Sequence, residues 1–367
     1  MKSIGLILFL FLCTPLFAQD FQKHGPSLEA LQKMADHNSS QSLLNFSEVF
    51  SSAQENNSIS PFFEYDETGY LFMSDGDYYG IAKEMKDIIA RELPTETTLV
   101  VYTTSTNSSY QNKLFKRYSQ LASPEQVKIL QVPSSGSNNF WTRDNLPIPA
   151  WDNGDFTLVD AQYYYNFEPD QFLSQLFGAK LIDHNYFFEG GNFMANSRGE
   201  CIVVNRKKAY PGGVSDTAAI PDSVFANKYG CKSLLRFKHL KGIGHADEVI
   251  KFMSDDIVVT DTHQYVQKLE DAGYTVHLLP EPDRNYETYA NSLQVNDTLF
   301  VPVFGESGDK KAIEVYESLN LGLKIVPIPS RRLATQGQGG IHCITMNYPK
   351  VPLQKLASDL GGKIIEQ

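Results

Sequence analysis

Residues 180–204 read KLIDHNYFFEGGNFMANSRGECIVV and combine several features. An apolar run at 180–183 leads into a loop that carries Glu189-Gly190-Gly191, and a tight turn at 197–200 leads into a second apolar run at 201–204. Short apolar runs bounded by Gly, Asn, Asp and Ser are typical of β-strands joined by turns. The stretch therefore predicts a strand, a polar loop, a hairpin turn and another strand.

The same order of features recurs along the chain at quasi-regular spacing. The five units occupy residues 128–159, 180–204, 234–259, 275–303 and 324–343. A supersecondary unit repeated in sequence indicates a repeat architecture, and polar loops at corresponding positions favour a ring of units with its site on the axis. An ordinary α/β sheet with unrelated loops is the alternative.

Two further predictions concern the ends of the repeat and the segments between units. No return strand is expected after Cys343, so residues 62–73, read as strand, turn and strand, should close the ring. Helices are expected at 79–93, where apolar residues recur at helical spacing, and between units at 262–272 and 310–319.

The amino terminus is typical of a secretory signal peptide. A lysine precedes an apolar run at 4–12, and Ala18 offers a small residue for cleavage. The run is too short to span a bilayer, so we expect removal of residues 1–18 and an exported protein, periplasmic or secreted, without membrane insertion. Residues 19–60, rich in Ser, Asn and Gln, are expected to form a partly ordered extension before a single catalytic domain at 61–367.

The composition and net charge indicate which kinds of molecule the protein binds. The net charge is −11 and the hydrophobic content is 42%, which is ample for a large core. Nucleic-acid binding relies on a basic surface, so no nucleic acid is expected as a partner. An acidic protein suits a cationic substrate.

The cysteines predict a free thiol. Cys13 is expected to leave with the signal peptide, so Cys201, Cys231 and Cys343 remain, an odd number in an exported chain. Cys201 and Cys231 either pair with each other or stay as two buried thiols.

Cys343 is the expected nucleophile. It lies in Gly339-Gly340-Ile341-His342-Cys343-Ile344-Thr345, a glycine-rich approach followed by a short apolar strand. The loops Trp141-Thr142-Arg143-Asp144, Glu189-Gly190-Gly191-Asn192 and Gly244-His245-Ala246-Asp247-Glu248 add an imidazole and several carboxylates. A thiol, an imidazole and acidic side chains together suit covalent attack on a flat cation such as a guanidinium.

The acidic residues and the histidine are expected to have different roles in the reaction. Asp144 and Asp247 are the candidates for paired carboxylates, which meet a guanidinium through charge-assisted hydrogen bonds. His245 and Asp247 lie two residues apart, so on a strand they would point to one face. A histidine beside a thiol lowers the pKa of the thiol and moves protons, and Glu189 is expected to orient His245.

Metal and serine-hydrolase chemistry are not favoured. His245, Asp247, Glu189 and Cys343 are all metal-ligating types, but no Cys-x-x-Cys or His-Glu-x-x-His spacing is present. His342 is expected to point away from Cys343 on a strand. No Gly-x-Ser-x-Gly elbow occurs, so we expect neither a metal nor a cofactor.

As a set, these motifs resemble those of the guanidine-modifying superfamily called penteins, and within it the agmatine deiminase and bacterial peptidyl-arginine deiminase group. The resemblance covers about residues 61–349. It implies an α/β fold in the form of a five-bladed pseudo-symmetric propeller. It also implies Cys343 as nucleophile, His245 as general acid and base, Asp144 and Asp247 as the guanidinium grip, and Glu189 as the support of His245. The residues expected to line the substrate site are Trp141, Arg143, Asn291 and Gly340.

The resemblance implies a hydrolase that turns a guanidinium into a ureido group with release of ammonia. Peptidyl-arginine to peptidyl-citrulline is the leading expectation because the chain is predicted to be exported. The alternatives are agmatine to N-carbamoylputrescine, an amidinotransferase, and a non-catalytic propeller that binds cationic peptides. Residues 165–169 lack the arginines that hold a substrate carboxylate in the best-known bacterial peptidyl-arginine enzyme, so Arg331 or Arg332 would have to serve instead.

Overall fold

The computed structural model describes residues 28–44, 58–133, 140–163, 167, 169–206 and 217–366. The predicted signal peptide (1–18) and most of the stretch 165–169 lie outside these residues.

The described residues form five separate sheets. The first contains β5 (Ile148–Asp152), β6 (Asp155–Gln162) and β7 (Lys180–Phe187), with β1 (Ile59–Pro61) at its edge; the second contains β8 (Met194–Ala195), β9 (Glu200–Asn205) and β10 (Ser233–Lys238). The third contains β11 (Ile250–Phe252), β12 (Ile257–Thr260) and β13 (Thr275–Leu278), and the fourth β14 (Leu293–Val295), β15 (Thr298–Val303) and β16 (Lys324–Pro329). The fifth contains β17 (Met346–Pro349), β2 (Thr68–Ser74), β3 (Thr98–Thr103), β4 (Val127–Gln131) and β18 (Lys363–Ile365).

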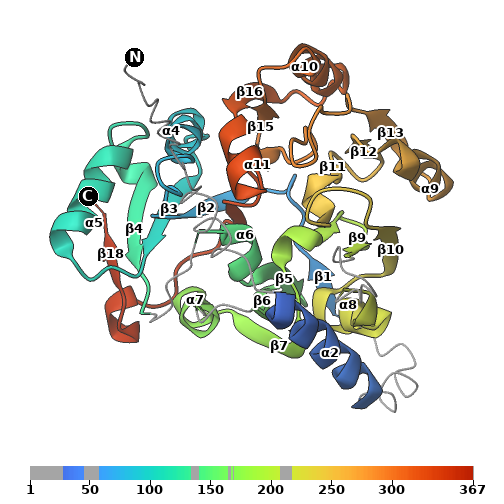
Figure 1. Cartoon of the computed structure of the whole chain (residues 1–367). Helices are drawn as coiled ribbons and strands as arrows, with labels where there is room; N and C mark the ends of the chain where they lie inside the picture. Colours follow the sequence, from blue (N-terminus) through green and yellow to red (C-terminus); the bar gives the residue numbers. More distant parts are fainter. Residues whose placement is uncertain are drawn as a thin grey trace, which may run out of the picture.

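All five sheets share one pairing scheme. An antiparallel pair comes first, as in β5–β6, β8–β9, β11–β12, β14–β15 and β17–β2. The second strand of each pair then has a parallel neighbour, as in β6–β7, β9–β10, β12–β13, β15–β16 and β2–β3. The repeated strand units predicted from sequence are therefore present, and Figure 1 shows the sheets around the middle of the molecule.

Helices supply the crossovers that parallel strands require. They are α4 (Lys83–Glu92), α5 (Ser108–Tyr118), α7 (Asp170–Phe177), α8 (Asp222–Tyr229), α9 (Val266–Asp271) and α10 (Gly308–Ser318). In α4, Met85 and Ile89 are buried one turn apart in a core cluster with Val101 and Ile328. Burial of each such side chain favours folding by roughly 1.5–3 kcal/mol. The helices expected near 79–93 and 262–272 are present with shorter bounds, and the helix expected near 310–319 is present at 308–318.

The polar loops connect one sheet to the next. They contain α6 (Thr142–Asn145), η2 (Gly190–Asn192), η4 (Ala246–Glu248) and α11 (Arg331–Gly337). Figure 1 shows α6 and α11 close to the middle of the molecule. The chemistry-bearing loops therefore occupy equivalent places in the repeat.

Two expectations about strands are wrong. A strand does follow Cys343, because β17 pairs antiparallel with β2 and brings the two ends of the catalytic region into one sheet. The segment 62–73 is not a strand, turn and strand of one hairpin, since β1 pairs with β5 while β2 pairs with β17 and β3. By contrast, the turn expected within the unit 128–159 is present. Asn153 and Gly154 join β5 and β6 with φ of 54° and 86°, the left-handed conformation that such two-residue turns require.

The predicted extension includes a helix that packs on β7 of the first sheet. In α2 (Leu28–Leu44), Asn38 exchanges two hydrogen bonds with the backbone of Phe187 on β7, at 3.0 and 2.8 Å. Among the described residues no helix is both long and apolar enough to cross a bilayer.

The cysteine alternative is resolved in favour of a pair. Cys201 on β9 and Cys231, which precedes β10, form a disulfide with a Cα–Cα distance of 5.7 Å. Cys343 is the free cysteine of the described residues, and it is buried.

Candidate active site

Three of the predicted side chains converge on the backbone of Gly191. A β-carbon built on Gly191 would lie 2.8 Å from Asp144 Oδ1, 2.8 Å from His245 Nδ1 and 3.1 Å from Asp247 Oδ2. These atoms come from two loops: Asp144 from the loop that contains α6, and His245 and Asp247 from the loop that contains η4. The absence of a side chain at Gly191 therefore leaves a small space bounded by two carboxylates and an imidazole.

Cys343 lies next to this space. Its Sγ is 3.5 Å from Asp247 Oδ2, 3.3 Å from Asn291 Nδ2 and 3.4 Å from the backbone nitrogen of Gly340. The thiol is 2% exposed. The residue occupies a turn before β17 and not the strand expected from sequence, because the glycine-rich loop bends the chain into the site.

Asn291 holds the thiol loop against the loop of Asp247. Its amide nitrogen also donates to the Asp247 carbonyl at 3.2 Å, and its oxygen accepts from the His342 backbone nitrogen at 3.0 Å. A β-carbon at Gly340 would lie 2.2 Å from that oxygen, so only glycine fits there. The structure brings both predicted residues to the thiol, where their contacts are with the protein itself.

Glu189 contacts His245 as expected. Its Oε2 lies 2.7 Å from His245 Nε2, so this ring nitrogen carries the hydrogen that it donates. The other ring nitrogen, Nδ1, is buried without a hydrogen-bond partner among the described residues and lies 3.6 Å from Asp144 Oδ1. Sequence reasoning missed Arg206, which follows β9 and also donates to Glu189 Oε2. A single basic residue after a strand gives no local signal of this role.

Asp144 and Asp247 present acceptors to the space beside Gly191. Asp144 Oδ1 accepts from the Gly191 backbone nitrogen at 3.0 Å. Asp247 Oδ1 is buried and has no hydrogen-bond partner among the described residues. The expectation that His245 and Asp247 share a strand face is wrong, since His245 caps the short helix η4 that contains Asp247. The turn of η4 still brings both side chains to the same space.

His342 does not point away from the site. Its Nδ1 lies 2.8 Å from Asp247 Oδ2, the same oxygen that faces the thiol, and its Nε2 lies 2.8 Å from Glu64 Oε2. Glu64 in turn forms an ion pair with the buried Lys251 at 2.7 Å. The strand alternation assumed for His342 fails because residues 341–344 form a turn.

Trp141 and Arg143 flank the thiol loop in different ways. The Trp141 ring would lie 2.6 Å from a β-carbon on Gly339, so it packs directly on the approach to Cys343. Arg143 is buried; its backbone nitrogen donates to the Cys343 carbonyl at 3.0 Å and its guanidinium donates to Asn347 at 2.8 Å. The contacts of Arg143 therefore anchor the thiol loop, and no contact places its guanidinium in the space beside Gly191.

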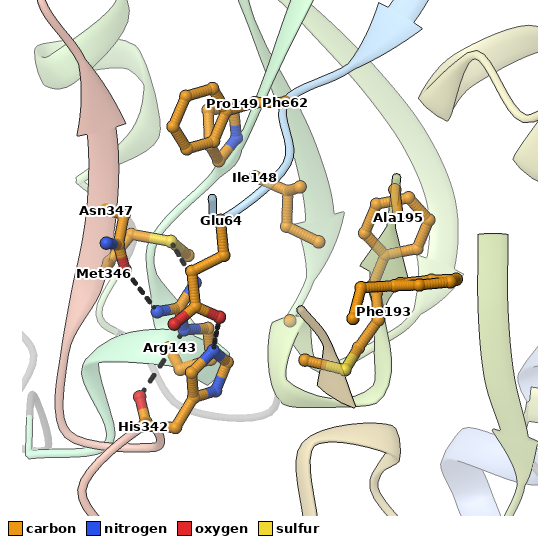
Figure 2. A pocket seen from close by; sticks show the side chains of 13 residues that line it. Phe62, Glu64, Arg143, Ile148, Pro149, Phe193, Ala195, His342, Met346 and Asn347 are labelled. Carbon is orange, nitrogen blue, oxygen red and sulfur yellow. Dashed lines mark hydrogen bonds and ion pairs between the residues drawn. The ribbon is translucent and has the colours of Figure 1, made fainter. Parts of the chain in front are cut away.

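A cavity of about 50 Å³ lies on another side of this loop, and Cys343 is not on its wall. Figure 2 shows Glu64 near Arg143 and His342 within it, with Phe62, Ile148 and Pro149 above and Phe193 across from them. This cavity is thus separate from the space beside Gly191, although His342 borders the cavity and contacts Asp247 beside the space.

Burial and charge shift the titrations of the site. Burial, only partly offset by His245, raises the pKa of Asp144 to about 7. Burial opposes the imidazolium of His245, but Asp144 and the hydrogen bond to Glu189 outweigh it and raise the pKa of His245 to about 9. Burial, followed by the charges of Asp247 and Asp144, raises the pKa of Cys343 well above its ordinary value.

Asp247 shifts in the opposite direction to Asp144. Burial would raise the pKa of Asp247, but the hydrogen bond and the charge of His342 outweigh burial and lower it. Two neighbouring carboxyls whose pKa values are moved apart are typical of catalytic sites. The site thus keeps one carboxylate charged and leaves the other sensitive to pH near neutrality.

The predicted carboxylate clamp is not free in this structure. Arg331 at the start of α11 is paired with Glu287 at 3.1 Å and with Glu306 at 2.7 Å. Arg332 is exposed beside it. Arg331 would have to give up two ion pairs to hold a substrate carboxylate.

The five-sheet fold and the buried thiol with its acidic loops define the class. This is an α/β pentein fold, shared with solved deiminases of the same architecture. A substrate-bound variant of the agmatine deiminase of C. jejuni superposes with a TM-score of 0.64, covering 80% of this chain and 97% of that one at 18% identity. The agmatine deiminase of Enterococcus faecalis gives 0.63, covering 80% and 96% at 17% identity.

The chain belongs to the Porphyromonas-type peptidyl-arginine deiminase family, whose model matches residues 75–349. In sequence it is also similar to a Marinomonas sp. (strain MWYL1) protein named "Putative agmatine deiminase", with 22% identity over 308 residues that cover 64% of this chain and 80% of the relative. The protein is therefore a hydrolase that acts on guanidino C–N bonds.

Proposed function

We propose that this protein is an agmatine deiminase that forms N-carbamoylputrescine and ammonia through a covalent intermediate on Cys343. The observation that carries the proposal is the space beside Gly191, where two buried carboxylates and an imidazole lie against a thiol. A buried acceptor with no donor among the described residues, such as Asp247 Oδ1, suits the N–H groups of a guanidinium.

Substrate binding prepares the thiol. The guanidinium donates to Asp144 and Asp247, and its positive charge offsets the two carboxylates that disfavour a thiolate at Cys343. The bound cation thereby lowers the pKa of the thiol that attacks it. Asn291 and the Gly340 nitrogen, at 3.3 and 3.4 Å, stabilise the developing thiolate.

The reaction then proceeds in two stages, formation of the covalent intermediate and its hydrolysis. The thiol of Cys343 loses its proton to solvent, its sulfur forms a bond to the guanidinium carbon, and the electron pair of a C–N π bond moves to nitrogen. His245, protonated at neutral pH because its pKa is about 9, donates a proton to the leaving nitrogen as the C–N bond breaks and ammonia departs. Neutral His245 next takes a proton from water, the oxygen bonds to carbon, and the C–S bond breaks to release the ureido product and restore the thiol.

Agmatine is preferred to peptidyl-arginine for two reasons. Relatives in sequence and in structure carry agmatine deiminase names, and Arg331 is already paired with two carboxylates. Peptidyl-arginine is the second candidate, favoured by the name of the family model and by the predicted export. We also propose that the five sheets are the blades of a pseudo-symmetric propeller, which their common pairing scheme supports.

The proposal includes export after cleavage near Ala18. The Cys201–Cys231 disulfide supports it, because such bonds persist mainly in oxidising compartments. Amino-terminal sequencing of the protein from a secreting host would detect Gln19 as the first residue, whereas an intact Met1 would contradict export by this route.

The test of the substrate is colorimetric detection of ureido product from agmatine, free arginine, a peptide with internal arginine, and peptides ending in free or amidated arginine. The highest kcat/KM is expected for agmatine. A clear preference for an internal-arginine peptide would move the assignment to the second candidate. Binding of cationic peptides without any product would support a non-catalytic protein.

A further inference from the structure

Four ionisable side chains form a continuous series of contacts that ends at Asp247; Lys251, His342 and Asp247 are buried and Glu64 is partly exposed. Lys251 Nζ lies 2.7 Å from Glu64 Oε1, Glu64 Oε2 lies 2.8 Å from His342 Nε2, and His342 Nδ1 lies 2.8 Å from Asp247 Oδ2. They come from the β1–β2 loop, from β11 and η4, and from the turn before β17. The series thus joins the amino-terminal, central and carboxyl-terminal parts of the catalytic region.

Stability alone does not account for such a series. Lys251 and Asp247 are both 0% exposed, and buried ion pairs often contribute no more to stability than apolar residues of the same size, because removing the charges from water is costly. The charged groups of this series nevertheless have further hydrogen-bond partners. Lys251 also donates to the Ser292 carbonyl at 3.0 Å, and Glu64 accepts from the Gln294 nitrogen at 2.6 Å.

The series fixes one oxygen of Asp247 and leaves the other available. His342 binds Oδ2, whereas Oδ1 is buried without a hydrogen-bond partner among the described residues. A carboxylate held at one oxygen cannot rotate freely, so its second oxygen keeps one direction. Preorganisation of this kind favours capture of a planar donor.

Part of this series of four side chains borders the cavity shown in Figure 2. Glu64 and His342 line that cavity, while Lys251 and Cys343 do not. Glu64 and Lys251 therefore lie behind His342 as seen from the thiol, with no contact to the space beside Gly191. Their side-chain contacts reach Asp247 through His342.

We propose that Lys251, Glu64 and His342 are positioning residues that hold Asp247 in the orientation required to capture the guanidinium, so that Lys251 determines cation recognition without touching the substrate. The proposal rests on the proposed function for the identity of the cation. It also predicts a property of the thiol that needs no turnover: Cys343 should react faster with a cationic electrophile than with a neutral one of the same shape.

The fold offers a matched control in Lys86. This second lysine is also 0% exposed, and burial lowers the pKa of both lysines. Lys86 on α4 donates to Ser74 and Gly76 and takes no part in the series that ends at Asp247. Lys251→Met and Lys86→Met therefore remove the same kind of buried charge in two places, only one of which is linked to Asp247.

The experiment measures alkylation of Cys343 by chloroacetamidine, which carries an amidinium, and by neutral chloroacetamide, with peptide mapping to identify the site. In each reaction the thiolate displaces chloride, so a C–S bond replaces a C–Cl bond. The ratio of the two rate constants reports recognition of the positive charge. We expect the ratio to fall at least fivefold in Lys251→Met and to stay within twofold of wild type in Lys86→Met.

Glu64→Gln is the second variant, because it keeps the size of the side chain should Lys251→Met fail to fold. It should also lower the ratio at least fivefold, since a neutral glutamine cannot offset the charge of Lys251 and has only one side-chain acceptor for Lys251 and His342. A ratio within twofold of wild type in either folded variant, or an equal fall in Lys86→Met, would overturn the positioning role. Failure of the proposed function would instead appear as a wild-type protein that makes no ureido product, whatever the alkylation ratio.

Discussion

His245 Nε2 donates to Glu189 Oε2 at 2.7 Å, and this hydrogen bond directs the opposite ring nitrogen toward Asp144 and the space beside Gly191. The contact sets both the orientation and the charge of the imidazole. Glu189→Gln keeps the shape but removes one of the charges that raise the pKa of His245. We expect kcat to fall by about 10²-fold or more, the range typical of a disabled general acid or base.

The same variant should move the alkaline limb of the pH profile. The pKa of His245 is raised toward about 9, in part by Glu189, so removing that charge lowers it. Activity that depends on protonated His245 should then be lost at lower pH than in wild type. An unchanged alkaline limb in Glu189→Gln would show that another group governs it.

Asp144→Asn and Asp247→Asn should each cripple substrate capture. Each substitution keeps the shape of the side chain and leaves the bound cation short of one buried counter-charge. Loss of one member of a buried charged pair costs about 2–5 kcal/mol, so kcat/KM for agmatine should fall by more than tenfold. A variant that stays within threefold of wild type would assign that aspartate to the structure alone.

Gly191→Ala tests the space itself. The added methyl group would lie 2.8 Å from Asp144 Oδ1 and His245 Nδ1, inside normal contact distance, and would occupy the place of the substrate. We expect near-complete loss of ureido formation with a folded protein by circular dichroism. Activity within threefold of wild type would place guanidinium binding elsewhere.

The pH dependence of kcat/KM should be bell-shaped. Asp144, with a pKa of about 7, accepts the cation better when it is ionised, so activity falls as the pH drops below 7. His245, with a pKa of about 9, must be protonated to release ammonia, so activity falls above 9. Asp144→Asn should abolish the acidic limb in its residual activity, and a limb that persists unchanged would assign that titration to another group.

Local sequence patterns predicted the strand units because most of them combine a short apolar run with a turn inside a short stretch of sequence, such as residues 180–204. They failed for residues 62–73, since the partners of β1 and β2 come from distant parts of the chain. For the same reason, sequence patterns did not indicate the series of hydrogen-bonded side chains behind Asp247. Glu64 and His342 are 278 residues apart in sequence yet share a hydrogen bond, and no periodicity records such a pairing.

The residues of the site were predicted from sequence motifs and not from geometric arguments about strands. Cys343, His245, Asp144 and Asp247 do lie together, although two of the strand arguments used for them were wrong. Short helical turns rotate side chains differently from strands, so spacing alone could not place His342. Arg206 was missed because its partner Glu189 lies on a different loop.

The central claim is that Cys343 attacks a guanidinium carbon. The most direct measurement is ureido formation from agmatine by wild-type protein and by Cys343→Ser, together with the intact mass of wild-type protein quenched in acid during turnover. The account predicts no detectable product from the folded serine variant and a thiouronium adduct on Cys343 in wild type. Near wild-type turnover by Cys343→Ser, with no adduct on the wild-type thiol, would contradict it.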